Sequence, residues 1–226
     1  MVTRNYQHVI WDWNGTLLND AWLCVDVMNQ MLYKYHKPAL SLARYHEIFD
    51  FPVQDYYLRL GFDFDETPFE DVGMEFMVGY FERWRRCQLQ IHARDILQNN
   101  AQAGMTQSVL SAMSMDLLRE HAAYFQIDAF FGTLSGLNHH YATGKLDLAH
   151  EFMQQSGLDP RKVVIIGDTT HDFHVSQALG TDCILFSGGH HPRYKLEQCG
   201  VPIVDDYQEL PPLLHSSNFE KLISLP

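Results

Sequence analysis

Two short apolar segments, far apart in the chain, each lead to an aspartate. Residues 9–11 read VIW before Asp12, and residues 163–166 read VVII before Gly167 and Asp168. Neither segment alternates apolar with polar residues, as a strand with one solvent-facing side does. We therefore expect both segments to be central strands of a parallel sheet that is covered on both faces.

The second half of the chain alternates predicted strands with predicted helices. Weaker strand patterns lie at residues 107–110, 183–186 and 201–204, and apolar residues at helical spacing lie at 145–156 and 172–179. Alternation of this kind is typical of an α/β protein with a doubly wound parallel sheet.

Residues 21–86 have a different pattern and contain no convincing strand. Apolar residues at the start of this segment follow helical spacing, and further helical stretches lie at 52–60 and 69–86. We expect an all-helical cap here, inserted after the first strand, while residues 1–20 and 87–226 form the α/β core. An insert at this point lies over the carboxyl edge of the sheet, where open α/β folds bind their ligands.

The charge balance excludes several classes of protein. Sixteen Lys and Arg residues against 28 Asp and Glu residues give a formal net charge of −12 at pH 7. A field of this sign repels polyanions, so we expect no nucleic-acid partner and no anionic-membrane partner. No apolar run reaches the roughly 18 residues that cross a bilayer, and the N-terminus lacks a signal-peptide pattern. We expect a cytoplasmic protein with free thiols, since its four cysteines include no CxxC pair.

Polar residues follow the predicted strands at the points where these strands end. Asp12, Ser111, Asp168 and Asp172 all lie at such positions. Carboxyl ends of parallel strands share one edge, so these residues are expected to converge there. Carboxylates gathered in one place repel one another unless a cation joins them, and Mg²⁺ prefers oxygen ligands. Lys145 follows a glycine at the start of a predicted helix and can reach the same place to neutralise an anionic substrate.

Four short motifs in this order resemble those of the haloacid dehalogenase superfamily of hydrolases. Residues 12–20 read DWNGTLLND and are similar to its first motif, while residues 109–111, VLS, resemble the second. Residues 144–145, GK, resemble the third, and residues 164–172, VIIGDTTHD, resemble the fourth. The tail at 187–205 is similar to the phosphoglycolate phosphatase-like branch. The resemblance covers essentially the whole chain and implies a helical cap at the predicted insert.

The resemblance implies a nucleophile and a metal site. Asp12 would attack phosphorus and form an aspartyl-phosphate. Mg²⁺ would be held by the Asp12 carboxylate, the backbone carbonyl of Asn14 and Asp168. Asp172 would support the ion through water.

Three further residues would act on the substrate in the same scheme. Ser111 would hydrogen-bond a phosphoryl oxygen, Lys145 would bridge that oxygen and Asp12, and Thr16 would position the loop and the phosphate. Positioning and charge neutralisation are what phosphoryl transfer requires. The implied function is a Mg²⁺-dependent phosphatase acting on a small phosphorylated metabolite.

Asn14 departs from the family's motif, which has a second aspartate at this position. That aspartate protonates the leaving oxygen and then activates water, and a carboxamide does neither. General acid–base help is typically worth about 10²–10⁴ in rate. Three hypotheses follow: substrates with good leaving groups, a slow enzyme with a long-lived aspartyl-phosphate, or a proton supplied by another group such as His171.

Two other branches and one non-enzymatic function remain as alternatives. The dehalogenase branch also lacks the second aspartate, and Arg44 lies at a plausible distance for its arginine, but that branch uses no metal. The phosphonatase branch needs a cap lysine, and Lys34 and Lys37 are the only candidates. A catalytically impaired module that binds phosphate or a partner is the third alternative, supported by Asn14 alone.

Two pairs of adjacent histidines, at 139–140 and 190–191, raise the question of a further metal site. Adjacent side chains on an extended segment point apart and chelate poorly. We interpret both pairs as parts of polar loops.

Overall fold

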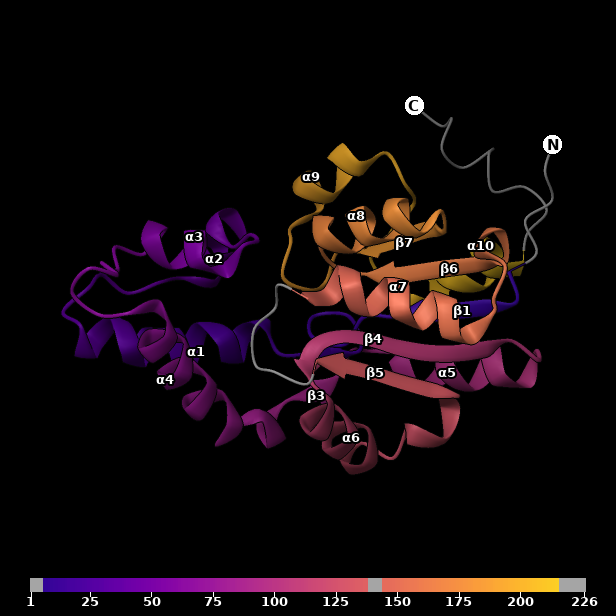
Figure 1. Ribbon diagram of the computed structural model, residues 1–226, viewed down its shortest axis with the longest axis horizontal. Helices are drawn as coiled ribbons and strands as arrows, with labels where there is room; N and C mark the ends of the chain where they lie inside the picture. Colours follow the sequence, from indigo (N-terminus) through magenta and orange to yellow (C-terminus); the bar gives the residue numbers. More distant parts are fainter. Residues whose placement is uncertain (1–5, 138–143, 216–226) are drawn as a thin grey trace.

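The computed structural model describes residues 6–137 and 144–215. Six strands form one parallel sheet in the order β5-β4-β1-β6-β7-β8 (Figure 1). Since β1 lies between β4 and β6, the chain changes direction across the sheet beside the end of β1, where ligands bind in such folds. The strands are β1 (His8–Trp11), β4 (Thr106–Ser114), β5 (Thr133–Leu137), β6 (Val163–Gly167), β7 (Asp182–Phe186) and β8 (Ile203–Val204).

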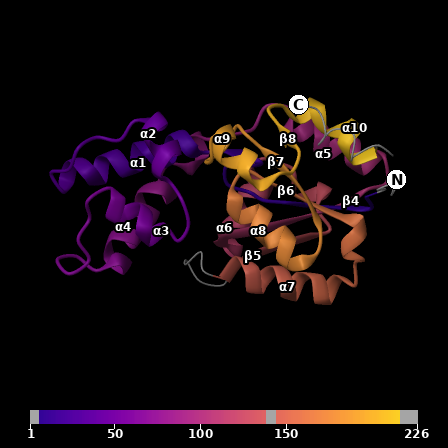
Figure 2. The ribbon, with the colours of Figure 1, turned by 90° about the horizontal axis from the view of Figure 1, so that it is seen from above.

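Helices cover both faces of the sheet, which confirms the doubly wound α/β prediction. Val9 and Trp11 of β1 pack in a cluster with α5, α6 and α10, whereas Ile10 packs with α7 and α8. The two helix layers lie on opposite sides of the strands (Figure 2). The helices are α5 (Ala93–Gln102), α6 (Met115–Tyr124), α7 (Lys145–Ser156), α8 (Thr170–Leu179) and α10 (Leu210–His215), with α9 (Arg193–Leu196) beside β7.

Two details of the sheet differ from the sequence prediction. Strand β4 continues to Ser114, so Ser111 lies within it rather than after its end. Strand β5 was not predicted, because its sequence, TLSGL, has the serine and glycine of a turn. Short 3-10 helices complete this half of the chain: η2 (Asp128–Phe130), η4 (Pro160–Lys162), η5 (Glu197–Cys199) and η6 (Tyr207–Glu209).

Four helices lie together beyond the carboxyl edge of the sheet (Figures 1 and 2). They pack around a hydrophobic cluster of their own, drawn from residues 21–72. The predicted helix over 69–86 ends at Phe81 and is followed by η1 (Trp84–Arg86). None of the helices in the described residues is both long and apolar enough to cross a bilayer. The four helices are α1 (Ala21–Lys34), α2 (Leu42–Ile48), α3 (Val53–Arg59) and α4 (Phe69–Phe81).

The two chain segments that lead to and from these helices pair with each other. Strand β2 (Leu18–Asn19) and strand β3 (Gln88–Leu89) are antiparallel, with Leu18 opposite Leu89. The N–H of Gln90 also donates to the carbonyl of Leu17 at 2.9 Å. Both connections are therefore fixed beside the turn that follows β1.

Candidate active site

Three buried aspartates converge at the carboxyl edge of the sheet. Asp12 follows β1, Asp168 follows β6 and Asp172 lies in the first turn of α8. One carboxylate oxygen from each lies within 4.8 Å of the other two. Three oxygen donors this close fit a hard divalent cation such as Mg²⁺, which takes carboxylate ligands and keeps several waters. The predicted convergence of these aspartates is confirmed.

Lys145 supplies the positive charge within this carboxylate cluster. It is the first residue of α7, and its buried Nζ donates to Asp12 Oδ1 and, at 2.7 Å, to Asp172 Oδ1. One ammonium facing three carboxylates leaves a net negative charge. The pKa of Asp12 is raised to about 8, and burial is the largest cause. Lys145 lowers this pKa, but the carboxylates of Asp172 and Asp168 raise it again. Burial also raises the pKa of Asp168 to about 6.

The loops around Asp168 are shaped by glycine. Gly15 has a φ of +76°, and a Cβ there would lie 2.2 Å from Asp168 Oδ2. A Cβ on Gly189 would meet the same oxygen at 2.2 Å. With the loops this close, Thr16 Oγ1 donates to Asp168 Oδ1 at 2.6 Å, and the N–H of His190 donates to Oδ2 at 2.7 Å. The Thr16 side chain therefore orients the Asp168 carboxylate.

Ser111 lies at the same edge of the sheet. Trp11 pairs with Val109 in the register of β1 and β4, which places Ser111 slightly beyond the level of Asp12. The Ser111 side chain is buried, and its Oγ accepts a hydrogen bond from the N–H of Met113 at 3.1 Å. Its position inside the longer β4 corrects the prediction that it follows a strand.

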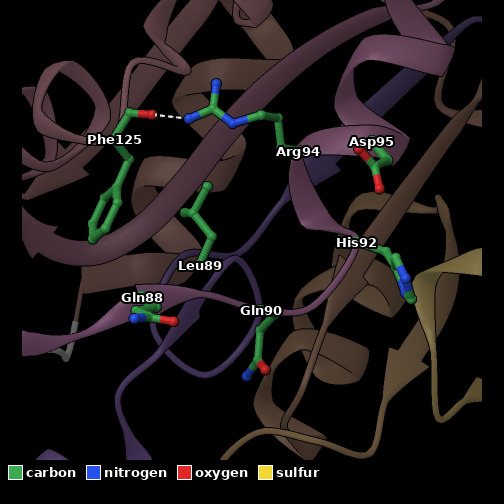
Figure 3. Close-up of a pocket in the computed structure, with 7 residues that line it drawn as sticks. All are labelled: Gln88, Leu89, Gln90, His92, Arg94, Asp95 and Phe125. Atoms are coloured by element: carbon green, nitrogen blue, oxygen red, sulfur yellow. Dashed lines mark hydrogen bonds between the residues drawn. The ribbon is translucent and has the colours of Figure 1, made fainter.

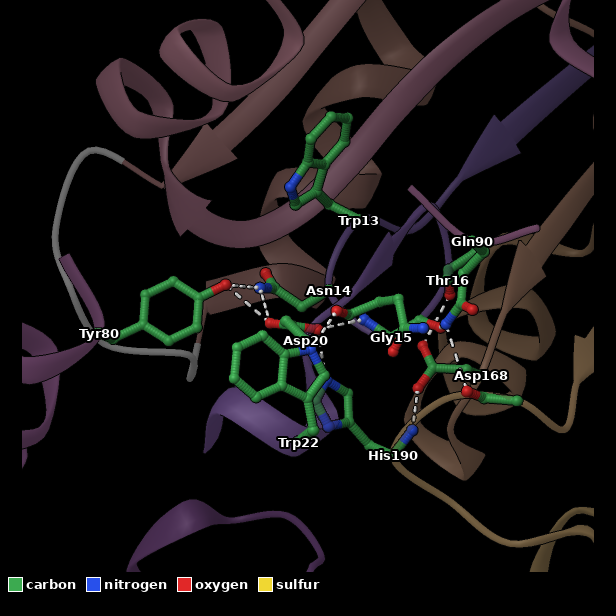
Figure 4. A network of polar contacts seen from close by, with 12 residues as sticks. Trp13, Asn14, Gly15, Thr16, Asp20, Trp22, Tyr80, Gln90, Asp168 and His190 are labelled. Atoms are coloured by element: carbon green, nitrogen blue, oxygen red, sulfur yellow. Dashed lines mark hydrogen bonds and ion pairs between the residues drawn. The ribbon is translucent and has the colours of Figure 1, made fainter. Parts of the chain in front are cut away.

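The side chain of Asn14 is bound to groups outside the carboxylate cluster. Its Nδ2 donates to Asp20 Oδ2 at 2.6 Å and to the Tyr80 hydroxyl at 2.9 Å. The Tyr80 hydroxyl in turn donates to Asp20 Oδ2 at 2.7 Å (Figure 4). The carboxamide nitrogen is thus engaged between the turn after β1 and helix α4.

Asp20 is a fourth buried carboxylate, to which the sequence analysis assigned no role. Its Oδ1 accepts from the N–H of Gly15 at 2.8 Å and lies 3.4 Å from His190 Nε2. Burial alone raises its pKa, but the His190 charge and the hydrogen bonds from His190, Asn14 and Tyr80 hold it below the usual value. The sequence signal that could have identified Asp20 was its position at the end of the 12–20 motif.

The histidines at 190–191 lie in a loop, as interpreted from the sequence, but both side chains are buried. His190 Nδ1 pairs with the Tyr45 hydroxyl at 2.7 Å, and His191 Nδ1 accepts from the N–H of Thr170 at 3.2 Å. Burial lowers the pKa of His190, but the nearby carboxylates, Asp20 first, raise it to about 9. Gly188 and Gly189 let this loop turn inward, a tertiary effect that local sequence does not reveal. The pair at 139–140 lies outside the described residues.

His171 directly precedes Asp172 in the first turn of α8. Its ring packs against Phe51, with 5.0 Å between centroids. Its Nε2 is buried without a hydrogen-bond partner among the described residues. Burial and the Lys145 charge lower the pKa of His171, so the ring is neutral near pH 7.

The basic residues that the alternative branches need are engaged elsewhere. Arg44 pairs with Glu47 at 2.7 Å on the surface, and Lys34 pairs with Glu75 at 2.8 Å. Lys37 donates to a backbone carbonyl in the same helical region. None of the three contacts the carboxylate cluster in these interactions, so the structure adds no support to a dehalogenase arginine or a phosphonatase lysine.

Two cavities have linings that include neither Lys145 nor an aspartate of the carboxylate cluster. One, of about 340 Å³, borders β3 and the start of α5 (Figure 3). Its lining residue Gln90 donates to the carbonyl of Gly15 at 2.9 Å, which connects this lining to the turn after β1. The other, of about 730 Å³, lies at the ends of β4 and β5 and includes Ser114 and Leu137. No aspartate of the cluster lines either one.

The fold is shared with solved structures at low sequence identity. A haloacid dehalogenase-like family protein from Streptococcus pneumoniae has a TM-score of 0.79 and 17% identity, covering 91% of this chain and 96% of that one. A protein described as a predicted phosphatase from Clostridium acetobutylicum has a TM-score of 0.77 and 17% identity, covering 98% and 100%. One described as a predicted phosphoglycolate phosphatase from Haemophilus somnus has a TM-score of 0.75 and 16% identity, covering 91% and 96%.

The sequence itself matches a family model. No curated protein is similar enough in sequence to match the chain. The model of haloacid dehalogenase-like hydrolases, however, matches residues 9–186, which include all three aspartates of the cluster and Lys145. This chain belongs to the haloacid dehalogenase-like hydrolase family.

Proposed function

We propose that this hydrolase is a Mg²⁺-dependent phosphatase that acts on a small phosphorylated metabolite with Asp12 as the nucleophile. One observation carries the proposal. The Asp12 carboxylate lies at the end of the central strand, paired with Lys145 and within 4.8 Å of Asp168 and Asp172. The proposed nucleophile, the Lys145 ammonium and the carboxylates that would bind a cation therefore lie together in a buried site.

The reaction would proceed in two displacements at phosphorus. A carboxylate oxygen of Asp12 forms a bond to phosphorus while the bond to the leaving alcohol oxygen breaks, which gives an aspartyl-phosphate. Water then attacks phosphorus while the bond from phosphorus to the Asp12 oxygen breaks, which releases inorganic phosphate and regenerates the carboxylate. The leaving alkoxide takes a proton from solvent and the attacking water gives one back to solvent, so protons balance over the two displacements although Asn14 transfers neither. The Lys145 ammonium would offset the negative charge of Asp12 and of the phosphoryl oxygens. Ser111, at the carboxyl edge of the sheet, would donate a hydrogen bond to one of these phosphoryl oxygens.

A bound Mg²⁺ would supply further positive charge beside the transferring phosphoryl group. Its ligands would be the carboxylates of Asp12 and Asp168 and the backbone carbonyl of Asn14, with Asp172 acting through water. Thr16 and the N–H of His190 hold Asp168 from two sides, so its orientation is set before a cation arrives.

Residues 21–86 would act as a cap on a core made of residues 1–20 and 87–226. Tyr45 of α2 and Tyr80 of α4 reach from the helical region to buried core groups. A cap held in this way would exclude bulk solvent from the site while admitting the attacking water, and it would limit the size of the substrate.

The test is a panel of phosphate esters, assayed with and without Mg²⁺, on the wild type and on Asp12→Asn. The matched control is Asp147→Asn, which removes an exposed carboxylate from α7. We expect Mg²⁺-dependent phosphate release in the wild type and control, and a loss of about 10⁴-fold or more in Asp12→Asn. Turnover that needs no metal, or that survives in Asp12→Asn, would contradict the proposal.

A further inference from the structure

Three hydrogen bonds join Asn14, Asp20 and Tyr80 into a closed triangle. The distances are 2.6 Å from Asn14 Nδ2 to Asp20 Oδ2, 2.9 Å from the same nitrogen to the Tyr80 hydroxyl, and 2.7 Å from that hydroxyl to Asp20 Oδ2 (Figure 4). The three residues come from the turn after β1, the residue before α1 and the last turn of α4. The residue that departs from the family's motif is therefore the one that contacts helix α4.

The chemistry of the triangle requires a donor at position 14. Asp20 is fully buried, and a carboxylate only accepts hydrogen bonds. Its Oδ2 is satisfied by Asn14 and Tyr80, while its Oδ1 accepts from Gly15. An aspartate at position 14 would replace the 2.6 Å hydrogen bond with two carboxylate oxygens facing each other.

Asp20 also connects to a second helix of the cap region. His190 Nε2 lies 3.4 Å from Asp20 Oδ1, and His190 Nδ1 pairs with the Tyr45 hydroxyl at 2.7 Å. Tyr45 lies on α2 and Tyr80 on α4, so one carboxylate is linked to two helices, directly through Oδ2 and by way of His190 through Oδ1. Both tyrosines, Asp20 and His190 are buried, and in a low-dielectric interior each such bond is costly to break.

We propose that Asn14 is a positioning residue: through Asp20 and Tyr80, its carboxamide fixes the turn that carries Asp12 to helix α4 and so holds the helical region over the site. The inference rests on the proposed function for its kinetic consequence, but its structural consequence stands alone. On this account position 14 is adapted to Asp20, and restoring an aspartate there alone weakens the enzyme.

The test is a double-mutant cycle at positions 14 and 20. Asn14→Asp places two carboxylates in contact, whereas the Asn14→Asp/Asp20→Asn double variant exchanges carboxylate and carboxamide and keeps the charge. In the double variant the carboxamide at position 20 can donate to the carboxylate at position 14, and the Tyr80 hydroxyl can bond both. Each variant is assayed for kcat and KM on one ester that the wild type hydrolyses, and for amide hydrogen exchange in α4 without substrate.

We expect Asn14→Asp to lower kcat/KM by about 10-fold, chiefly through KM, and to speed exchange in α4. The double variant should regain kcat/KM to within about 3-fold of wild type and regain the protection of α4. Additive losses in the double variant would overturn the inference, as would an Asn14→Asp enzyme that equals or exceeds the wild type. If the wild type hydrolyses no ester, the phosphatase proposal fails, while the exchange of α4 across the cycle still decides the role of Asn14.

Discussion

The cluster of three buried aspartates and the neighbouring buried Asp20 differ in their electrostatics. In the cluster of Asp12, Asp168 and Asp172, one ammonium faces three carboxylates, and burial raises the pKa of Asp12 to about 8. At Asp20, the nearby His190 charge and the hydrogen bonds from His190, Asn14 and Tyr80 outweigh the effect of burial, and the pKa stays below its usual value.

The difference separates the proposed reactive site from a structural one. A carboxylate whose donors are complete has nothing left to bind, and it stabilises the position of whatever donates to it. A cluster with excess negative charge attracts a cation, and a bound cation offsets that charge. His190 joins the two, since its N–H donates to Asp168 and its ring lies beside Asp20.

The largest effect is expected from removing the cation of the cluster. Lys145→Met leaves Asp12 and Asp172 buried without a counter-charge, so the free energy of unfolding should fall by about 3–5 kcal/mol in metal-free protein. Phosphate release should fall by about 10²–10³-fold. Urea unfolding and steady-state assays measure both, with the exposed Lys162→Met as the matched control. Unchanged stability would mean that the cluster needs no internal cation.

The response to Mg²⁺ should distinguish the two groups directly. At about one hundred times its Kd, Mg²⁺ should raise the free energy of unfolding by about 2.7 kcal/mol. The increase should disappear in Asp168→Asn and persist in Asp20→Asn, since only the first change removes a proposed ligand. Thermal melts with and without Mg²⁺ measure the shift. An equal response in both variants would mean that Asp20 and the carboxylate cluster do not differ in their role in Mg²⁺ binding.

A pH effect is expected from His121, whose ring nitrogen accepts from Trp13 at 3.1 Å. Burial lowers the pKa of His121 to about 4 from 6.5, so the folded state disfavours its protonation. The contribution of the neutral ring to the free energy of unfolding is present above pH 6.5 and is lost progressively as the pH falls from 6.5 through 4. About 2 kcal/mol of it is gone by pH 5.

This pH dependence can be assigned to one ring. Urea unfolding at pH 7.5 and pH 5 should show a smaller loss in His121→Gln than in the wild type, and the exposed His174→Gln is the matched control. A ring pKa of 6 or above for His121, measured by NMR titration, would remove the basis of the prediction.

The smallest effect is expected from the hydroxyl of Tyr80. Tyr80→Phe removes the hydrogen bond that the hydroxyl donates to the charged Asp20 and the one that it accepts from Asn14, and it should cost about 1.5 kcal/mol in the free energy of unfolding. Tyr33→Phe, on an exposed ring of α1, should cost nothing. If both variants unfold alike, the contact between α4 and Asp20 contributes no stability.

The same contrast explains which parts were predictable from the sequence. Asp12 and Asp168 each follow a continuous apolar run, so local sequence marks both the strand and its end. The parallel sheet then brings them together, and Lys145 follows from its place at the start of α7. The end of β4 and the whole of β5 were harder to predict, because serine and glycine within these strands resemble the residues of a turn.

The network around Asp20 has no comparable local signal. Tyr80 is 66 residues from Asn14, and Tyr45 is 145 residues from His190. Nothing in the sequence around either tyrosine distinguishes it from the aromatic residues that pack within the helical region. Such contacts become visible only when the helices are placed against the core.

The central claim is that Asp12 becomes phosphorylated during turnover, and rapid acid quench followed by peptide mass spectrometry tests it most directly. Enzyme mixed with Mg²⁺ and an excess of a hydrolysed ester should carry the mass of one phosphoryl group on the Asp12 side chain. The modification should convert to homoserine on borohydride reduction and be absent in Asp12→Asn. Steady release of phosphate with Asp12 unmodified, by an enzyme whose Asp12→Asn variant remains active, would contradict the account.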